Sequence, residues 1–329
     1  MEFTQEVRKA TDPIYQKISK VMPEIEWSVH APYIHKINKL KKEKNAVILA
    51  HNYQTPEIYH GVADFSADSL ALAIEASKTE ADIIVMCGVH FMAETAKLMS
   101  PKKKVLLPDM KAGCSLSSSI TGEDVRNLKK RYPGIPVVSY VNTSADVKAE
   151  TDVCCTSANA VKIVNSLGVK KVIFLPDDYL AKYVASQTDV EIISWKGTCE
   201  VHEQFNDEEI NEIRKNNPGI KIIAHPECPP DVIQASDFAG STSGMIKYVK
   251  DNQPQKVMMV TECSMSDNVQ IDNPKVEFIR PCNLCPHMKR ITLPKILDCL
   301  ENESNELIME HDTIEKARKS VERMAEIGR

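Results

Sequence analysis

The stretch KNAVILAHNYQ, residues 44–54, decides the fold of this chain. Its run at 46–50 is short, apolar and rich in β-branched or aliphatic side chains, which is typical of a strand buried in a parallel sheet. Directly after this run come His51, Asn52 and Tyr53, where the strand ends. Two later runs share the pattern: PVVSY at 136–140 and IKIIA at 220–224.

The apolar runs recur along the chain at a nearly constant spacing, which is the signature of an internal repeat. The first run of each set ends at or before His51, Tyr140 and His225, which are 89 and 85 residues apart. Spacings of 86 residues separate the fourth runs, which begin at Val105, Glu191 and Glu277. Helical patterns lie between the runs, so the chain reads as successive βαβ units.

The repeat predicts an α/β fold of three pseudo-symmetric, three-layer αβα domains, each with a four-stranded parallel sheet, around a central active site. The expected domains are 44–112, 113–198 and 199–288, with flanking helices at 1–43 and 289–329. The alternative is one large doubly wound sheet whose strands are evenly spaced by coincidence.

Composition excludes several functional classes. The chain has 329 residues, 41 basic and 46 acidic, with a net charge of −5, so it has no basic field for nucleic acid or an anionic membrane. The N-terminus lacks the apolar core of a signal peptide, and a cytoplasmic location is expected. No GxG, Walker A loop or HExxH motif occurs. Ten cysteines are many for a reducing compartment and indicate metal or redox chemistry.

Polar triplets follow the first strand of each predicted domain, where open α/β sheets bind ligands. They are His51-Asn52-Tyr53, Tyr140-Val141-Asn142 and His225-Pro226-Glu227. In each triplet the outer two side chains face the same way on an extended backbone. Together they supply two imidazoles and one carboxylate, which suits acid–base work on a substrate. Solvated loop polarity would explain one triplet but not three in equivalent positions.

A second repeated position carries Ser69, Ser157 and the pair Ser241-Thr242, each before a helical pattern. Serine is a preferred N-cap residue, which alone would explain the position. Helix N-termini also bind anions, so a substrate rich in carboxylate or phosphate fits the same residues.

The cysteines suggest a metal centre built by the repeat. Cys199 and Cys285 follow the fourth strands of the second and third domains, 86 residues apart. Strict symmetry puts their partner at Cys114, whereas Cys87 ends the third strand of the first domain. Three thiolates would hold an iron–sulfur cluster by three corners and leave one iron open as a Lewis acid. The alternatives are cysteines that act as small buried hydrophobes, and a zinc half-site or redox pair at Cys282-Asn283-Leu284-Cys285.

Several longer motifs resemble one known family, in order along residues 35–300. They are AHNYQ at 50–54, ADFSADSL at 63–70, MCGVHFMAET at 86–95, PVVSYVNT at 136–143, CTSANA at 155–160, HPEC at 225–228 and GSTSGM at 240–245. With them the chain resembles the quinolinate synthase family of bacterial NAD biosynthesis. The family's three similar α/β domains around a 4Fe-4S cluster agree with the repeat.

The resemblance implies that iminoaspartate condenses with dihydroxyacetone phosphate to give quinolinate, with loss of phosphate and water. It implies cluster ligands Cys87, rather than Cys114, with Cys199 and Cys285, while a swap between Cys282 and Cys285 stays open. The implied substrate contacts are His51, Ser69, Tyr140, Asn142, Ser157, His225, Glu227, Ser241 and Thr242. As the one carboxylate of the triplets, Glu227 is the expected general base, with Tyr53 and Tyr140 relaying protons and His51 holding substrate.

Two other functions compete with this reading. One is a zinc-dependent or metal-free aldolase or lyase on the same scaffold. The other is a redox-sensing or phosphometabolite-binding protein that uses the Cys282 and Cys285 pair as a switch. Because iminoaspartate is unstable, an aspartate-oxidising enzyme is an expected partner of the synthase.

Overall fold

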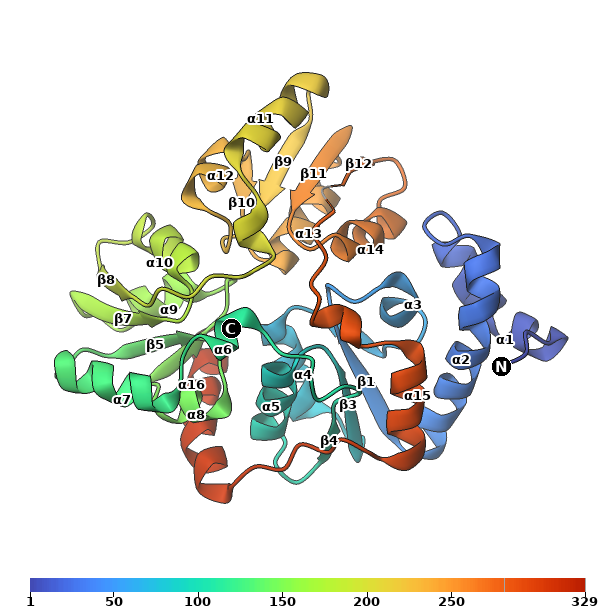
Figure 1. Cartoon of the computed structure of the whole chain (residues 1–329), viewed down its shortest axis with the longest axis horizontal. Coiled ribbons are helices and arrows are strands. Elements are labelled where there is room, and N and C mark those ends of the chain that lie inside the picture. Colours follow the sequence, from blue (N-terminus) through green and yellow to red (C-terminus); the bar gives the residue numbers. More distant parts are fainter. Residues whose placement is uncertain (281, 329) are drawn as a thin grey trace. The chain divides into compact units, whose positions relative to one another are not determined.

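The chain forms three four-stranded parallel sheets (Figure 1). A computed structural model describes residues 1–280 and 282–328. Each sheet has the same order, in which the second strand in sequence lies at one edge, next to the first. The first sheet is β2-β1-β3-β4, the second β6-β5-β7-β8 and the third β10-β9-β11-β12. The strands of one sheet pair only with each other among the described residues, so the predicted three-sheet fold is confirmed and the single doubly wound sheet is excluded.

The strands begin and end close to the apolar runs of the sequence. Those of the first sheet are β1 Ala46–His51, β2 Phe65–Ala67, β3 Ile83–Cys87 and β4 Lys104–Leu106. Those of the second sheet are β5 Val137–Tyr140, β6 Val153–Cys155, β7 Lys171–Leu175 and β8 Glu191–Ser194. Those of the third sheet are β9 Lys221–Ala224, β10 Phe238–Ala239, β11 Lys256–Val260 and β12 Glu277–Ile279.

An aspartate just before the second strand ties the start of the first strand in every sheet. Asp64, Asp152 and Asp237 occupy this position. Their carboxylate oxygens accept hydrogen bonds from backbone N–H groups of Ile48 at 2.8 Å, Val137 at 2.7 Å and Ile222 at 2.9 Å. The same aspartates donate their own backbone N–H to the carbonyls of those three residues. The same pair of hydrogen bonds therefore recurs in all three sheets, as the internal repeat of the sequence does.

The chain divides into two compact units, each made of three separate segments. The first unit comprises Met1–Ala112, Glu262–Lys275 and Leu284–Leu307, and contains the first sheet. Its helices are α1 Gln5–Ile18, α2 Glu24–Glu43, α3 Pro56–Tyr59, α4 Ser69–Lys78, α5 His90–Met99, α14 Ser264–Asp272, α15 Leu293–Asn302 and the short 3-10 helix Met288–Arg290. Helix α15 packs on α2 and β3, burying Ile296, Cys299 and Leu300.

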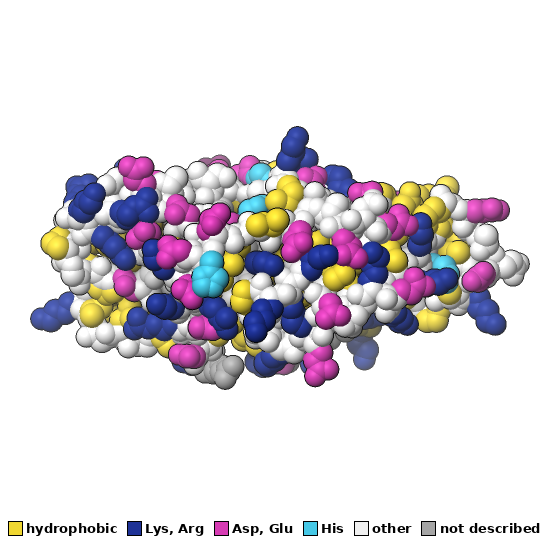
Figure 2. Space-filling model, turned by 90° about the horizontal axis from the view of Figure 1, so that it is seen from below, with side chains coloured by type: hydrophobic (Ala, Val, Ile, Leu, Met, Phe, Trp, Pro, Cys, Tyr) yellow, Lys and Arg dark blue, Asp and Glu magenta, His cyan; other side chains and the backbone are white. Residues whose placement is uncertain are grey.

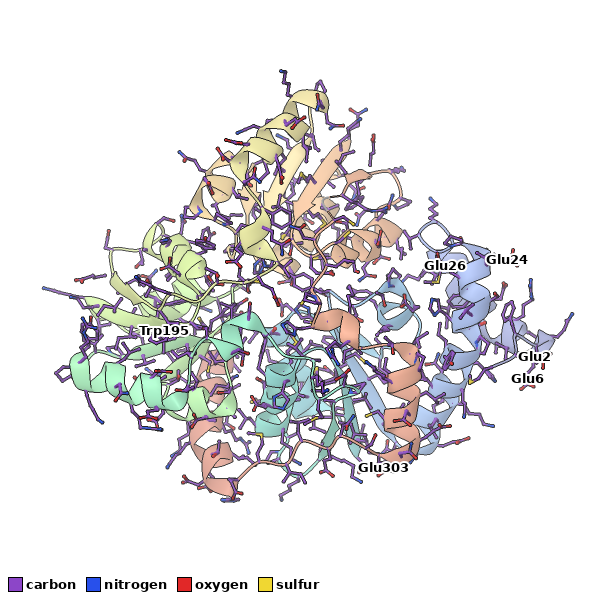
Figure 3. All side chains as sticks on the ribbon, viewed as in Figure 1. Glu2, Glu6, Glu24, Glu26, Trp195 and Glu303 are labelled. Carbon is purple, nitrogen blue, oxygen red and sulfur yellow. The ribbon has the colours of Figure 1, made fainter. Side chains whose placement is uncertain are left out.

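Helix α15 ends at Glu303, a residue with a positive φ of 48° that is labelled at the end of this helix in Figure 3. Its carboxylate binds Lys44 Nζ at 2.8 Å and Lys104 Nζ at 2.5 Å. These hydrogen bonds lower the pKa of Glu303 to about 2. The ion pairs thus link the C-terminal end of α15 to the end of α2 and to β4 within the first unit.

The second unit comprises Gly113–Thr261, Val276–Asn283 and Ile308–Arg329, and contains the other two sheets. Its helices are α6 Ser115–Ser118, α7 Gly122–Arg131, α8 Ala145–Ala149, α9 Ala160–Ser166, α10 Asp178–Ala185, α11 Asp207–Asn216, α12 Pro230–Ala235, α13 Thr242–Asn252, α16 His311–Gly328 and the short 3-10 helix His202–Gln204. The last helix, α16, runs along α8 and β6. Trp195, labelled in Figure 3, follows β8 and donates its indole N–H to the Ser119 carbonyl at 3.1 Å.

The packing of three helices differs from their order in the sequence. Helix α14 lies between β11 and β12 in the chain, yet it belongs to the unit of the first sheet. Helices α15 and α16 follow one another but pack in different units. The three domains expected from the repeat are continuous stretches of sequence, whereas each compact unit combines three separate segments. The expected domain boundaries therefore stay a prediction.

Basic and acidic side chains are mixed over the face shown in Figure 2, with hydrophobic side chains between them. Among the helices of residues 1–280 and 282–328, none has both the length and the apolar character of a membrane span.

Candidate active site

Glu227 lies at the centre of a buried polar cluster in the second unit. It follows β9, whereas Tyr140 is the last residue of the equivalent strand β5 and Asn142 follows that strand. The Tyr140 hydroxyl donates to Glu227 Oε1 at 2.5 Å, and Asn142 Nδ2 donates to the same oxygen at 3.4 Å. Glu227 and Tyr140 are only 4% and 5% exposed. The structure therefore brings together three of the residues that the sequence places at strand ends.

Two imidazoles complete this cluster. His202 Nδ1 lies 2.8 Å from Glu227 Oε2, and His202 Nε2 lies 2.9 Å from Thr261 Oγ1. The ring of His225 stacks on that of His202, with the centroids 4.9 Å apart. On its other side, His225 Nε2 lies 3.1 Å from Ser157 Oγ, so Ser157 also belongs to the cluster.

The electrostatics of the cluster fix the charge of its carboxylate. Burial raises the pKa of Glu227, but the charges of His225 and His202 and hydrogen bonds from His202 and Tyr140 outweigh burial. The pKa of Glu227 is therefore held well below its usual range. Asp177, which follows β7, has the opposite state, since burial and the nearby charge of Glu227 raise its pKa well above the usual range. Burial and the neighbouring charges thus shift the pKa values of these two carboxyl groups in opposite directions.

Cys199 adjoins the cluster, with its Sγ 3.1 Å from His202 Nδ1. The ligand atoms of Cys199, His202 and Glu227 all lie within 4.8 Å of one another, which is close enough for one metal ion. Burial raises the pKa of the Cys199 thiol, and the neighbouring Glu227 and Cys114 raise it further. Ser115, next to Cys114 in the sequence, donates its hydroxyl to the Thr198 carbonyl at 3.1 Å and accepts the Glu200 N–H at 3.1 Å, so Cys114 and Cys199 lie on adjacent loops of the same unit.

The serine positions of the repeat differ in their local roles. Ser241 is the N-cap of α13, and its Oγ accepts a hydrogen bond from the Gly244 N–H at 3.2 Å, as the sequence predicts. Thr242, the next residue, is buried at the start of that helix. The N-cap prediction is wrong for Ser157, because Asn159 occupies the N-cap position of α9 and Ser157 contacts His225 instead.

In the first unit, His51 and Tyr53 form a local pair at the end of β1. Their rings pack edge to face with centroids 4.6 Å apart, and the Tyr53 N–H donates to His51 Nδ1 at 3.2 Å. His225 Nδ1 accepts the Glu227 N–H at 3.4 Å with the same two-residue spacing. Ser69 lies one residue inside α4, where Asp68 is the N-cap, so the N-cap prediction is also wrong there.

The remaining predicted metal ligands, Cys87 and Cys285, also lie in the first unit. Cys87 is fully buried at the end of β3, and its pKa is raised by burial and by Cys299 of α15. Cys285 is half-buried, and its backbone N–H donates to Glu262 Oε1 at 3.4 Å. Glu262 is itself fully buried and pairs with Lys289 at 2.8 Å. Cys282 is exposed.

Sequence reasoning missed His202, Thr261 and Asp177. His202 begins a short 3-10 helix three residues after Cys199, and its Nδ1 lies 3.1 Å from Cys199 Sγ. A histidine so close in the sequence to a predicted metal ligand could have been identified as a candidate. Thr261 lies one residue after β11, and Asp177 lies two residues after β7. Both are third strands of their sheets, whereas the triplet pattern covers only the residues after the first strands. The repeat marks strand ends, but contacts between neighbouring loops depend on packing.

A family model described as quinolinate synthetase A protein matches residues 35–326. A quinolinate synthase of Sinorhizobium fredii is 60% identical over 327 residues, covering 99% of this chain and 91% of that protein. One of Caulobacter vibrioides is 56% identical over 329 residues, covering 99% and 90%. One of Xylella fastidiosa is 60% identical over 294 residues, covering 89% and 87%. The chain therefore belongs to the quinolinate synthetase A protein family, which is a family of enzymes.

Proposed function

We propose that the chain is a quinolinate synthase that condenses iminoaspartate with dihydroxyacetone phosphate to give quinolinate, with loss of phosphate and water. The observation that carries this proposal is the buried cluster around Glu227, found in a member of this family. Condensation and dehydration both need a proton acceptor and donors beside the reacting carbons. Glu227 supplies the acceptor, and Tyr140 and His202 each lie within hydrogen-bonding distance of it.

Glu227 is proposed as the general base, and its protonation state sets what it can do. Its low pKa keeps it ionised before substrate arrives, so no proton has to leave it first. A low pKa also makes a carboxylate a weak base. When Tyr140 or His202 binds substrate instead of Glu227, Glu227 loses a hydrogen bond that lowers its pKa, and it becomes a stronger base. Tyr140 then acts as the proton donor for the departing oxygen.

The other predicted residues bind the charged groups of the substrates. Both proposed substrates carry anionic groups, a carboxylate pair or a phosphate. Ser241 and Thr242 begin α13, where backbone N–H groups and the helix dipole favour an anion. His225 with Ser157 in the second unit, and His51 with Ser69 in the first, supply further donors. Asn142 and Tyr53 are proposed to orient the substrate.

A 4Fe-4S cluster is the proposed cofactor. Cysteine thiolates hold such clusters, and all ten cysteines of this chain are free of disulfides. Cys199, Cys285 and either Cys87 or Cys114 would be the ligands. When bound, the cluster supplies a Lewis-acidic iron with one position open to substrate. The free thiols also suit a reducing compartment, which supports a cytoplasmic location.

The choice between Cys87 and Cys114 for the first ligand can be argued from their surroundings. Cys87 is fully buried and interacts with Cys299 in the layer between β3 and α15. Cys114 is only half-buried, and it interacts with Cys199, a proposed ligand. These contacts favour Cys114, the residue given by strict symmetry, over Cys87, the residue implied by family resemblance. Cys114→Ser should lose iron and activity, while Cys87→Ser should keep both.

Iron and acid-labile sulfide per chain, measured after anaerobic purification, test the cofactor. About four of each would support the cluster. The zinc-dependent lyase remains the second candidate, because Cys199, His202 and Glu227 have the donor types and spacing of a zinc site. Zinc at about one per chain, with little iron after reconstitution, would favour that second candidate.

Glu227→Gln tests the base assignment in the iron-loaded enzyme. The variant keeps an oxygen acceptor for Tyr140 but removes the charge, so turnover should fall by about 10²- to 10⁴-fold. Its iron content should equal that of the wild type. Near-normal turnover would show that another group removes the proton. Because iminoaspartate is unstable, the assay should generate it with an aspartate-oxidising enzyme, which we also propose as the functional partner.

A further inference from the structure

We propose that Lys148 and Asn268 are positioning residues, each of which holds one strand-end loop so that its site residue keeps its orientation. Lys148 acts on the loop that carries Asn142, and Asn268 acts on the loop that carries Tyr53. Each reaches two backbone carbonyls, one on either side of that site residue. The inference rests on the proposed function, because Asn142 and Tyr53 are proposed to contact substrate.

Lys148 is a fully buried lysine that donates to two backbone carbonyls. It lies on α8 with 0% of its surface exposed. Its Nζ donates to the Val141 carbonyl at 2.9 Å and also to the Thr143 carbonyl. An ammonium group is costly to bury unless its hydrogen bonds are made. The buried ammonium group of Lys148 therefore needs both carbonyls as acceptors. Its hydrogen bonds to them in turn hold the loop in place.

The helix that carries Lys148 is itself anchored within the second unit. Ser144 caps the start of α8, with its Oγ accepting the Val147 N–H at 3.4 Å. The carbonyl of Lys148 accepts a hydrogen bond from Ser320 Oγ of α16 at 3.0 Å. The position of Nζ is thus set by two helices. Asn142 lies between the two bound carbonyls, and its amide reaches Glu227 Oε1.

Asn268 makes the corresponding arrangement in the first unit. It lies on α14, is 3% exposed, and its Nδ2 donates to the carbonyls of Asn52 at 3.2 Å and Gln54 at 2.8 Å. The residue between these carbonyls is Tyr53. In both loops one donor group bridges carbonyls two residues apart, and the enclosed residue is the third member of a strand-end triplet. The donors come from different elements, so the repeat alone does not explain the likeness.

The expected consequence is kinetic. A donor bound to both carbonyls restricts the backbone of the residue between them, since each carbonyl belongs to a planar peptide group. Without the donor, the enclosed side chain moves, and a displacement on the order of 1 Å in a catalytic group can cost about 10²-fold in rate. The enzyme therefore should lose turnover although neither Lys148 nor Asn268 touches substrate.

Lys148→Met tests this, because methionine keeps much of the length of lysine but cannot donate. Lys103→Met is the matched control. Lys103 Nζ also bridges carbonyls two residues apart, those of Thr79 and Ala81, but this loop precedes β3 and carries no proposed site residue. Backbone hydrogen exchange by mass spectrometry reports each loop directly. The kcat and KM of the iron-loaded enzymes, compared with their urea midpoints, report function and stability.

In Lys148→Met we expect faster exchange over residues 141–144 and a kcat lowered by at least about tenfold at unchanged iron content. In Lys103→Met we expect faster exchange over residues 79–82, a lower urea midpoint and a kcat within about twofold of wild type. A loosened 141–144 loop with normal kcat, or an unchanged loop, would overturn the proposal for Lys148. Equal kcat losses in both variants would show general destabilisation instead.

Asn268→Leu provides a second test if Lys148→Met does not fold. It removes the donor at similar volume and should speed exchange over residues 52–55 with a comparable fall in kcat. Normal kcat in this variant would overturn the proposal. If the wild type makes no quinolinate, the proposed function fails, while the exchange data still decide whether Lys148 and Asn268 hold their loops.

Discussion

At the scale of single residues, two buried carboxyl groups of the second unit have pKa values that are shifted in opposite directions for physical reasons. Glu227 has four hydrogen-bonding or charged neighbours that favour its anion: Tyr140, Asn142, His202 and His225. Asp177 has backbone N–H donors on Oδ1 alone, while its Oδ2 has no hydrogen-bond partner among the described residues. Burial disfavours the anion of Asp177, and repulsion from the Glu227 carboxylate disfavours it further, so the pKa of Asp177 is raised.

Asp177→Asn should therefore stabilise the protein at pH 7. The raised pKa means that folding binds a proton above the unfolded pKa near 3.8, so the free energy of unfolding is lowered as pH rises above that value. Asparagine keeps the oxygen that caps α10 and needs no proton. We expect a higher urea midpoint for the variant at pH 7, with the difference shrinking toward pH 4.

Asp177→Ala is the control for the cap: at pH 7 it should be about 1 kcal/mol less stable than Asp177→Asn, because the N–H groups of Tyr179 and Leu180 lose their acceptor. If Asp177→Asn were less stable than the wild type at pH 7 and gained relative stability as pH fell, Asp177 would be an anion in the folded protein.

The contacts of single site residues could be predicted from the sequence only in part. Tyr140, Asn142 and Glu227 lie in contact because equivalent strands of two sheets end near each other, and the repeat identifies those ends. His202 comes from an irregular loop after β8 that no periodic pattern marks. The serines of the repeat have one sequence position but different roles, because a shift of one or two residues at a helix start changes which side chain is the cap.

At the scale of secondary-structure elements, the repeated aspartate joins the first strand of each sheet to the start of the second. Asp152 accepts the N–H of Val137, a fully buried residue at the start of β5, and donates its own N–H to the Val137 carbonyl. This pair closes the connection between β5 and β6 through α8. A buried backbone N–H without a partner is costly, so the side chain contributes to the stability of the strand pair.

Asp152→Ala should lower the free energy of unfolding by about 1–3 kcal/mol, because Val137 N–H then lies buried without an acceptor. Asp152→Asn keeps a side-chain oxygen in place and should lose less. Urea denaturation followed by circular dichroism gives both values. Equal losses in the two variants would show that the charge of Asp152, and not its hydrogen bond to Val137, stabilises β5.

At the scale of the whole molecule, the apolar runs predict the three sheets because each buried strand is a short local run of Val, Ile and Leu. The division into two units is not local. Helices α15 and α16 are separated by eight residues, 303–310, yet α15 packs on α2 of the first unit and α16 on α8 of the second. Both helices are amphipathic, and their sequences say that one face is buried without saying against which element. The same holds for α14.

This division predicts where two matched core substitutions act. Leu300 of α15 and Met324 of α16 are both fully buried, one in each unit. Leu300→Ala and Met324→Ala should each lower stability by about 2–5 kcal/mol, because each leaves a cavity. Local opening then becomes easier in the unit that contains the cavity. Hydrogen exchange should rise in Leu300→Ala over α2 and β3, and in Met324→Ala over α8, α9 and β6. An equal rise throughout both units in either variant would show that the two units open as one cooperative body, despite their separate cores.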